Sequence, residues 1–264
     1  MNMKIWIVDA FATQPFSGNP AAVVIVDEFP PDELCQKIAA EMNLSETAFA
    51  KPVSQDYFHL RWFTPKTEVK LCGHATLATA HILYQENKVR GNTITFDSLS
   101  GPLLVYKNSQ DANLTLDFPL QVTGPFLNKD IYEKTLGLDI VAVAKALDDL
   151  IIEIADPVQL KNIEISSEKI KQFDYRGVII TAKDHQKYDF ISRFFAPRVG
   201  VNEDPVTGSA HCKLAHYWQE KLGQSQFLAY QASQRGGELK LAIKNDRVHI
   251  TGSAIIMLQG DLKA

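Results

Sequence analysis

An internal repeat is the feature that most constrains how this chain of 264 residues can fold. Around Arg61 the chain reads Phe-His-Leu-Arg-Trp-Phe-Thr-Pro, and half a chain length later, around Arg193, it reads Phe-Ile-Ser-Arg-Phe-Phe-Ala-Pro. Three pairs of segments match in the same order, and they begin at Phe58 and Phe190, at Gly73 and Gly208, and at Ser100 and Gly236. Matches in one order predict two copies of one unit, with chance similarity between amphipathic strands as the alternative.

Each copy is predicted to run as strand, loop, helix and further strands. The aromatic segment His59–Phe63 is typical of a strand. Residues 71–85 include no acidic residue, Lys or Arg, and their apolar side chains cover several sides, which indicates a helix that is buried all round. Gly208–Trp218 is the predicted counterpart, with Lys213 as its one charged residue. Paired strands are predicted after each helix, at 93–96 with 103–106 and at 226–230 with 239–243.

A helix that is buried on all sides needs a sheet that curves around it. We therefore predict an α+β fold of two pseudo-symmetric lobes, each a curved, mostly antiparallel, barrel-like sheet around a central helix. The N-terminal lobe is expected to span residues 1–118, with the last strand, about 250–264, as a candidate to complete it. The C-terminal lobe is expected to span 119–249. Apolar residues on one face also predict helices over Asp32–Met42 and Asp139–Leu150.

The charge balance and the cysteines limit the partners and the compartment. Lys and Arg number 27 against 31 Asp and Glu, so the net charge is −4, without the basic excess of proteins that bind nucleic acid. No apolar run approaches the length of a membrane span or of a secretory signal. The three cysteines form no disulfide or zinc pattern. We expect a cytoplasmic protein with a small-molecule partner, without nucleic acid or membrane.

The starts of the two buried helices are candidate anion sites. Gly73 and Gly208 fall in the first turns, where backbone N–H groups are unpaired and the helix dipole is positive. Glycine lets a ligand approach the backbone closely. We expect the two starts to meet at one cleft between the lobes and to bind a carboxylate or a developing enolate there, with Ser209 beside them. The alternative is that Gly and Ser merely cap the helices.

Candidate acids and bases lie near these helix starts. Glu46 belongs to a predicted strand whose small alanine neighbours leave room for a ligand, although most Glu residues are simply solvated. Asp204 precedes the second helix and has an N-terminal cap as its alternative role. His74 begins the first helix, where the dipole favours a neutral ring. Cys72 is beside that start, but Thr207 is its counterpart in the second half, so there is no thiol pair.

Known cofactor motifs are absent from the sequence. It contains no Gly-x-Ser-x-Gly elbow, no phosphate-binding loop, no His-Glu-x-x-His and no dinucleotide-binding glycine pattern after a strand. We therefore expect no metal, nucleotide or flavin cofactor.

Taken together, these segments resemble the PhzF family of phenazine-biosynthesis-like proteins, within the diaminopimelate-epimerase-like fold. The resemblance runs along the whole chain, and its motifs are Asp9–Phe11, Pro15–Val24, Leu44–Phe49, Arg61–Pro65, Leu71–Ala78 and Glu203–Ala210. It implies two similar lobes with the active site in the cleft, a homodimer, and catalysis without a cofactor.

The resemblance also implies roles for particular residues. Glu46 matches the family's proton-transferring glutamate, His74 and Asp204 match its His and Asp, and Ser209 matches its serine. Asn19, in the Gly-Asn-Pro turn, is expected to line the pocket. Related epimerases flank the substrate with two cysteines, and because Thr207 holds the second position here, a two-thiol racemase is not expected.

The function predicted from these residues is isomerisation by proton transfer. Glu46 would remove a proton next to an acidifying group of a small carboxylic acid or amino-acid-like substrate and return it elsewhere on the same face. The amides of Gly73, His74, Gly208 and Ser209 would stabilise the growing negative charge. An epimerase or dehydratase of the same fold, or a binding protein without turnover, are the alternatives. The segment near Gln231 departs from the pattern of many family members, which leaves the substrate open.

Overall fold

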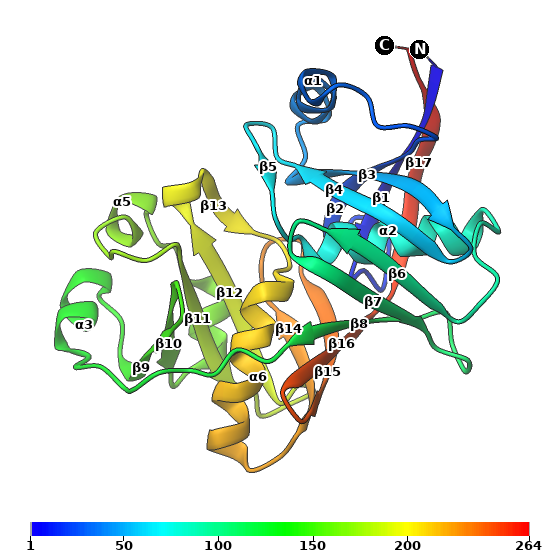
Figure 1. Ribbon diagram of the computed structural model, residues 1–264. Coiled ribbons are helices and arrows are strands. Elements are labelled where there is room, and N and C mark those ends of the chain that lie inside the picture. Colours follow the sequence, from blue (N-terminus) through cyan, green and yellow to red (C-terminus); the bar gives the residue numbers. More distant parts are fainter. Residues whose placement is uncertain (1, 264) are drawn as a thin grey trace. The chain divides into compact units, whose positions relative to one another are not determined.

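The computed structural model describes residues 2–263, and these form two compact units. Unit 1 contains the chain up to Phe118 together with the segment from His249 onward, and unit 2 is Pro119–Val248 (Figure 1). The chain therefore leaves unit 1 once and returns to it at the end. Each unit combines strands with helices, so the predicted α+β class is confirmed.

Unit 1 is built on a mixed sheet. Its elements are β1 (Asn2–Ala10), β2 (Asn19–Ile25), α1 (Asp32–Met42), β3 (Glu46–Ser54), β4 (Tyr57–Phe63), β5 (Glu68–Val69), α2 (Gly73–Gln85), β6 (Thr93–Ser98), β7 (Gly101–Lys107), β17 (Ala254–Lys263) and most of β8 (Leu114–Pro119) and β16 (Arg247–Gly252). Strand β8 ends in unit 2 and β16 begins there. Strand β1 runs antiparallel to β2 and β17, so the last strand belongs beside the first. Strands β2 and β3 are parallel, β3 and β4 antiparallel, and β4 and β6 parallel.

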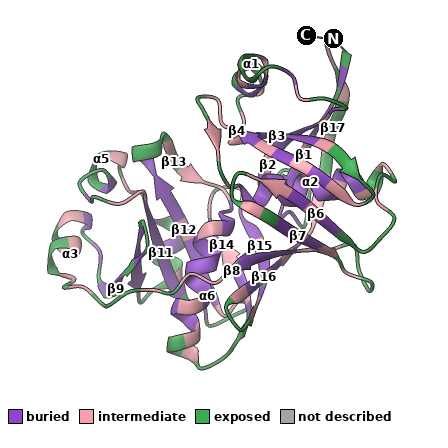
Figure 2. Cartoon of the chain, viewed as in Figure 1, coloured by how far each residue is buried: buried purple, intermediate pink, exposed green. Residues whose placement is uncertain are grey.

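Helix α2 lies in the interior of unit 1 and packs against β1, β2, β3 and β17 (Figure 2). All of its residues from Gly73 to Ala80 are buried. This burial confirms the prediction made from the absence of charge along the segment, because a helix with no charged face can be covered on every side.

Unit 2 repeats this order of elements. Its elements are α3 (Asp130–Leu136), β9 (Ile140–Ala146), β10 (Asp149–Ile154), α4 (Pro157–Asn162), α5 (Ser167–Ile170), β11 (Gly177–Lys183), β12 (Phe190–Ala196), a 3-10 turn (Pro197–Val199), β13 (Val201–Asp204), α6 (Gly208–Leu222), β14 (Gln226–Gln231) and β15 (Gly237–Lys244). The pairs β10–β11 and β12–β14 are parallel, and β9–β10, β11–β12 and β14–β15 are antiparallel. These match the pairings of β1–β2–β3–β4–β6–β7, which confirms the internal repeat.

The repeat extends to a side-chain arrangement. Arg61 binds both carboxylate oxygens of Glu68 in unit 1, and Arg193 binds both oxygens of Glu203 in unit 2. Each guanidinium also lies 5.0 Å from the ring of the phenylalanine two residues later. The two matching Arg-x-Phe segments of the sequence therefore form the same kind of arginine–glutamate ion pair, once in each unit.

The helix predicted over Asp139–Leu150 is wrong, because this segment forms the β9–β10 hairpin. Ile140 and Val143 are buried as expected, but Leu147 lies exposed in the turn with a positive φ of 56°. Over so short a segment, the apolar residues fit both the spacing of a helix face and that of a half-buried strand. The turn between the two strands also contains no glycine that would have indicated a hairpin. The helix predicted over Asp32–Met42 is confirmed with those bounds.

None of the helices within residues 2–263 is long and apolar enough to cross a membrane.

Candidate active site

Glu46 and His74 come together inside unit 1. Glu46 is the first residue of β3, and His74 is the second residue of α2. Oε2 of Glu46 lies 3.3 Å from Nε2 of His74. The His74 side chain is 5% exposed and the Glu46 side chain 18%, so a reachable carboxylate stands beside a buried imidazole.

The surroundings of His74 hold its ring neutral. Burial lowers the pKa of His74 to about 3, because a charged imidazolium would lose its hydration. Nδ2 of Asn19 lies 3.2 Å from Nδ1 of the ring. Since an amide nitrogen can only donate, Nδ1 accepts and the ring carries its proton on Nε2. The side of the ring that faces Glu46 is therefore the N–H side.

A turn that requires glycine places Asn19 at this position. Asn19 begins β2, directly after Gly18, whose φ is +71°. A side chain on Gly18 would put its Cβ 2.2 Å from the carbonyl oxygen of Ala10, so only glycine fits. Asp9 is also buried here, and its carboxylate accepts a hydrogen bond from the backbone of Phe16. Asp9 is thus tied to the loop that leads into the Gly-Asn-Pro turn.

Cys72 joins the same cluster from the position before α2. Its Sγ lies 3.5 Å from Nδ1 of His74, and the residue is 6% exposed. The carbonyl of Cys72 accepts hydrogen bonds from both the amide and the hydroxyl of Thr76, which hold the start of the helix. The structure thus brings together Asn19, Glu46, Cys72, Gly73 and His74.

Asp204 lies at the end of β13 in unit 2, in a hydrogen-bonded network with Gln231. The Asp204 carboxylate accepts from the Thr207 hydroxyl at 2.6 Å. The fully buried Gln231 donates to the carbonyl of Asp204 and accepts from the amide of Thr207, at 2.7 and 2.8 Å. One glutamine therefore joins the aspartate to the residue that precedes α6.

Gly208 and Ser209 form the first turn of α6, next to a buried charge network. The Ser209 hydroxyl accepts from Arg176 at 3.3 Å, and Arg176 also binds Asp149, which is fully buried. Lys213, one turn further along the helix, binds Asp149 as well. Both cations also bind Asp148, so two positive charges balance two carboxylates here, and Arg176 contacts the serine.

The starts of α2 and α6 are alike. Cys72 and Thr207, the residues before them, both have extended backbones, and neither side chain caps its helix, the two helices lying wholly within the described residues. First-turn N–H groups that the preceding side chain does not cap can bind an anion.

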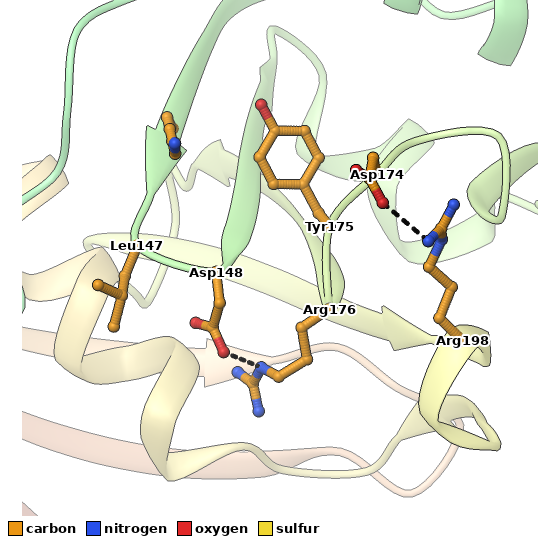
Figure 3. A pocket seen from close by; sticks show the side chains of 7 residues that line it. Leu147, Asp148, Asp174, Tyr175, Arg176 and Arg198 are labelled. Atoms are coloured by element: carbon orange, nitrogen blue, oxygen red, sulfur yellow. Dashed lines mark hydrogen bonds and ion pairs between the residues drawn. The ribbon is translucent and has the colours of Figure 1, made fainter.

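A surface pocket of about 640 Å³ lies elsewhere in unit 2 (Figure 3). It is lined by Lys145, Leu147, Asp148, Asp174, Tyr175, Arg176 and Arg198. Figure 3 shows Arg176 turned to Asp148 and Arg198 turned to Asp174. Its charges are largely neutralised as ion pairs, and it contains none of the predicted site residues, so we do not take it as the active site.

Sequence reasoning missed Gln231 and Arg176 as parts of these networks. No local motif marks either residue, because both act through contacts with distant segments. The one available signal was Lys213, the single charged residue of the segment Gly208–Trp218, because a charge in a buried segment requires a buried partner.

Comparison with known proteins indicates the family of this chain. The family model described as phenazine biosynthesis-like protein (PhzC-PhzF) matches residues 8–260. An uncharacterized isomerase from Halalkalibacterium halodurans is 47% identical over 268 residues, covering 99% of each chain. The human phenazine biosynthesis-like domain-containing protein is 40% identical over 290 residues, covering both chains fully.

Solved structures agree with this assignment. A PhzF family protein from Enterococcus faecalis superposes over all of both chains with a TM-score of 0.94 and 42% identity. A hydroxyproline epimerase from Agrobacterium vitis covers 99% of this chain and 92% of its own with a TM-score of 0.65; at 11% identity it shows a shared fold alone, which confirms the predicted epimerase-like fold. The chain belongs to the PhzC-PhzF family of phenazine biosynthesis-like proteins.

Proposed function

We propose that this protein is an isomerase that moves a proton on a small carboxylic acid or amino-acid-like substrate without a cofactor. The observation that carries the proposal is the 3.3 Å contact between the Glu46 carboxylate and a neutral His74. The isomerase names of its relatives support the reaction class.

Glu46 is the base in the proposed reaction. Its carboxylate takes the proton from a carbon next to the substrate's acidifying group, and the electrons of the broken C–H bond move into that group. The same carboxyl group then returns the proton to a different carbon on the same face, so substrate and product are isomers. The buried ring of His74, held by Asn19, presents its N–H side to Glu46 at 3.3 Å.

The first-turn N–H groups of the helices are proposed to stabilise the negative charge that develops. Gly73 and His74 supply them in α2, and Gly208 and Ser209 in α6. Asp204 is proposed to orient the substrate, from the position that Gln231 and Thr207 hold. This proposal requires one substrate to meet residues of both units, as the resemblance to the family implies.

The test is a screen of small carboxylic acids in deuterated water, followed by NMR. We expect Glu46→Gln to reduce deuterium incorporation by roughly 10²–10⁴-fold, because the amide cannot accept the proton. Asp204→Asn should also reduce it. Glu41→Gln, at an exposed glutamate of α1, is the matched control and should exchange at the wild-type rate. Equal exchange in wild type, Glu46→Gln and Asp204→Asn would overturn the assignment.

The products of the same screen distinguish related reactions. Deuterium at a stereocentre with inversion would indicate an epimerase, and loss of water a dehydratase. A ligand that binds with unchanged affinity to Glu46→Gln and undergoes no exchange would indicate a binding protein.

We also propose a cytoplasmic homodimer. The resemblance to the family supports the dimer, and the three buried cysteines Cys35, Cys72 and Cys212, which form no disulfide within residues 2–263, suit a reducing compartment. Light scattering after size-exclusion chromatography tests the dimer: a mass of about 29.5 kDa, that of one chain, would contradict it.

A further inference from the structure

Glu46, Cys72 and His74 place three different metal-binding groups within a small volume. Each offers one ligand atom, and these atoms lie within 4.8 Å of one another. Sγ of Cys72 is 3.5 Å from Nδ1 of His74, and Oε2 of Glu46 is 3.3 Å from Nε2, the other ring nitrogen. In a tetrahedral zinc site the ligand atoms are about 3.3–3.6 Å apart, because each is 2.0–2.3 Å from the metal.

The chemistry of the three groups selects the kind of cation. A thiolate, an imidazole and a carboxylate are all ligands of Zn²⁺, and three protein ligands leave the fourth position to water. Mg²⁺ and Ca²⁺ prefer oxygen ligands alone, so a site with sulfur and nitrogen disfavours them.

A separate observation also indicates a ligand here. Nε2 of His74 is buried, and although Oε2 of Glu46 lies 3.3 Å away, no described residue gives this nitrogen a hydrogen bond. Buried polar atoms without a hydrogen bond are rare in folded proteins, and an ion is one of the few explanations. Access is available from the side of Glu46, whose side chain is 18% exposed.

Binding the metal at Nε2 requires changes at Cys72, at the His74 ring and at Asn19. Cys72 approaches the ring at Nδ1, so its side chain must turn toward Glu46. The ring proton moves to Nδ1, where the amide of Asn19 can rotate and accept it through its oxygen. A ligating histidine whose other nitrogen donates to a neighbour is the usual arrangement in zinc sites.

We propose that Glu46, Cys72 and His74 form a reversible binding site for Zn²⁺, which acts as an inhibitor and not as a cofactor of the reaction. On binding, the metal loses water molecules and replaces the proton of the Cys72 thiol, which passes to the buffer. Metal binding stands independently of the proposed function, whereas inhibition rests on it, because the bound metal occupies the Glu46 carboxylate that serves as the base.

Binding is tested on the full chain, freed of metal with EDTA, by titration with Co²⁺ and by Zn²⁺ calorimetry. We expect a sulfur-to-cobalt charge-transfer band that Zn²⁺ abolishes and Mg²⁺ does not. Cys72→Ala should lose the band and bind Zn²⁺ at least tenfold more weakly, because even the loss of an outer partner of a metal ligand costs about 10–100-fold. Cys35→Ala, at another buried thiol, is the matched control and should keep both properties.

Folding of the variants is checked by thermal melting, with Cys72→Ser as a second variant closer in size and polarity. A wild-type protein without the cobalt band, or Cys72 variants that bind Zn²⁺ as tightly as the Cys35→Ala control, would overturn the site.

Inhibition is measured by deuterium exchange. Zn²⁺ should stop exchange in the wild type, EDTA should restore it, and Cys72→Ala should need at least tenfold more Zn²⁺ for the same fractional loss. If no acid exchanges even without metal, the proposed function fails while the cobalt band still decides the site. If exchange proceeds and the band is absent, the metal site fails alone.

Discussion

Asn19 donates a hydrogen bond to Nδ1 of His74 across 3.2 Å, and this contact decides which ring nitrogen faces Glu46. Asn19 is fully buried and His74 is 4% exposed, so water is poorly placed to substitute for the contact. The amide therefore determines the tautomer of the imidazole beside the proposed base.

Replacing Asn19 with Asp should reverse that tautomer. A carboxylate accepts from Nδ1–H, which leaves the ring either charged or with a lone pair directed at Glu46. Nitrogen-15 NMR of labelled histidine should show the proton moving to Nδ1. Deuterium exchange should fall by about tenfold or more, a part of the roughly 10²–10⁴-fold that general acid–base catalysis contributes. Asn87→Asp, at an exposed loop position, should change neither measurement.

Replacing Gln231 with Glu should destabilise unit 2. The buried amide donates to the Asp204 carbonyl and accepts from the Thr207 amide, and a carboxylate can make only the second contact. An unsatisfied buried group costs about 1–3 kcal/mol, so the free energy of unfolding in urea should fall by that amount. Gln226→Glu, at an exposed position of the same strand, is the control. Equal stability of the two variants would mean that the Gln231 network contributes nothing.

Local sequence patterns predicted those helices that are buried either on all sides or on one side only. The segment of α2 has no charged residue, and α1 has one apolar side after two prolines, so both helices could be predicted. The β9–β10 hairpin could not, because its turn at Leu147 has no glycine or proline and its apolar residues also fit helical spacing. Whether such a segment forms a helix or a strand depends on its pairing with other strands, which a single sequence does not show.

The residues of the candidate site also fall into two groups, those that a local motif predicts and those that only long-range contacts identify. Glu46 and His74 lie in recognisable motifs, and the structure places them in contact. Gln231 meets Asp204, and Arg176 meets Ser209, across long separations in the chain. Even Lys213, conspicuous as a lone charge, could not identify Asp149 as its partner. Residues that act through such long-range pairs need coordinates to be found.

The buried His211 should make stability depend on pH. Burial lowers the pKa of His211 to about 4, partly opposed by its bond to the Thr207 carbonyl, while the unfolded chain protonates near 6.5. The carbonyl of Thr207 lies 2.8 Å from Nδ1 of His211, and the ring of Phe190 stacks against the imidazole.

Between pH 6.5 and 4 the unfolded state therefore binds more protons at this residue, so its contribution to stability falls as the pH falls. The loss amounts to about 3 kcal/mol by pH 4, from the shift of the pKa. Urea unfolding across this range should show a shallower pH dependence in His211→Gln than in wild type. His185→Gln, at an exposed histidine, should keep the wild-type slope. A wild-type slope in His211→Gln would contradict the assignment.

The repeated arginine–glutamate pairs should contribute to stability in both units. Arg193 is 12% exposed, binds Glu203 with two hydrogen bonds and also donates to the carbonyl of Ile163. Arg193→Gln leaves the Glu203 carboxylate without its partner guanidinium, and we expect the free energy of unfolding to fall by about 2–4 kcal/mol.

Arg61→Gln should act in the same direction and less strongly, because Arg61 is 22% exposed against 12% for Arg193, and its second partner, Asp32, is 78% exposed and remains solvated without it. Lys37→Gln removes an ion pair on the surface of α1, where both side chains are at least 70% exposed, and should cost less than about 1 kcal/mol. Urea unfolding of the three variants gives the order. If Lys37→Gln proved as destabilising as Arg193→Gln, the repeated pairs would be ordinary surface contacts, and the internal repeat would retain them for a reason other than stability.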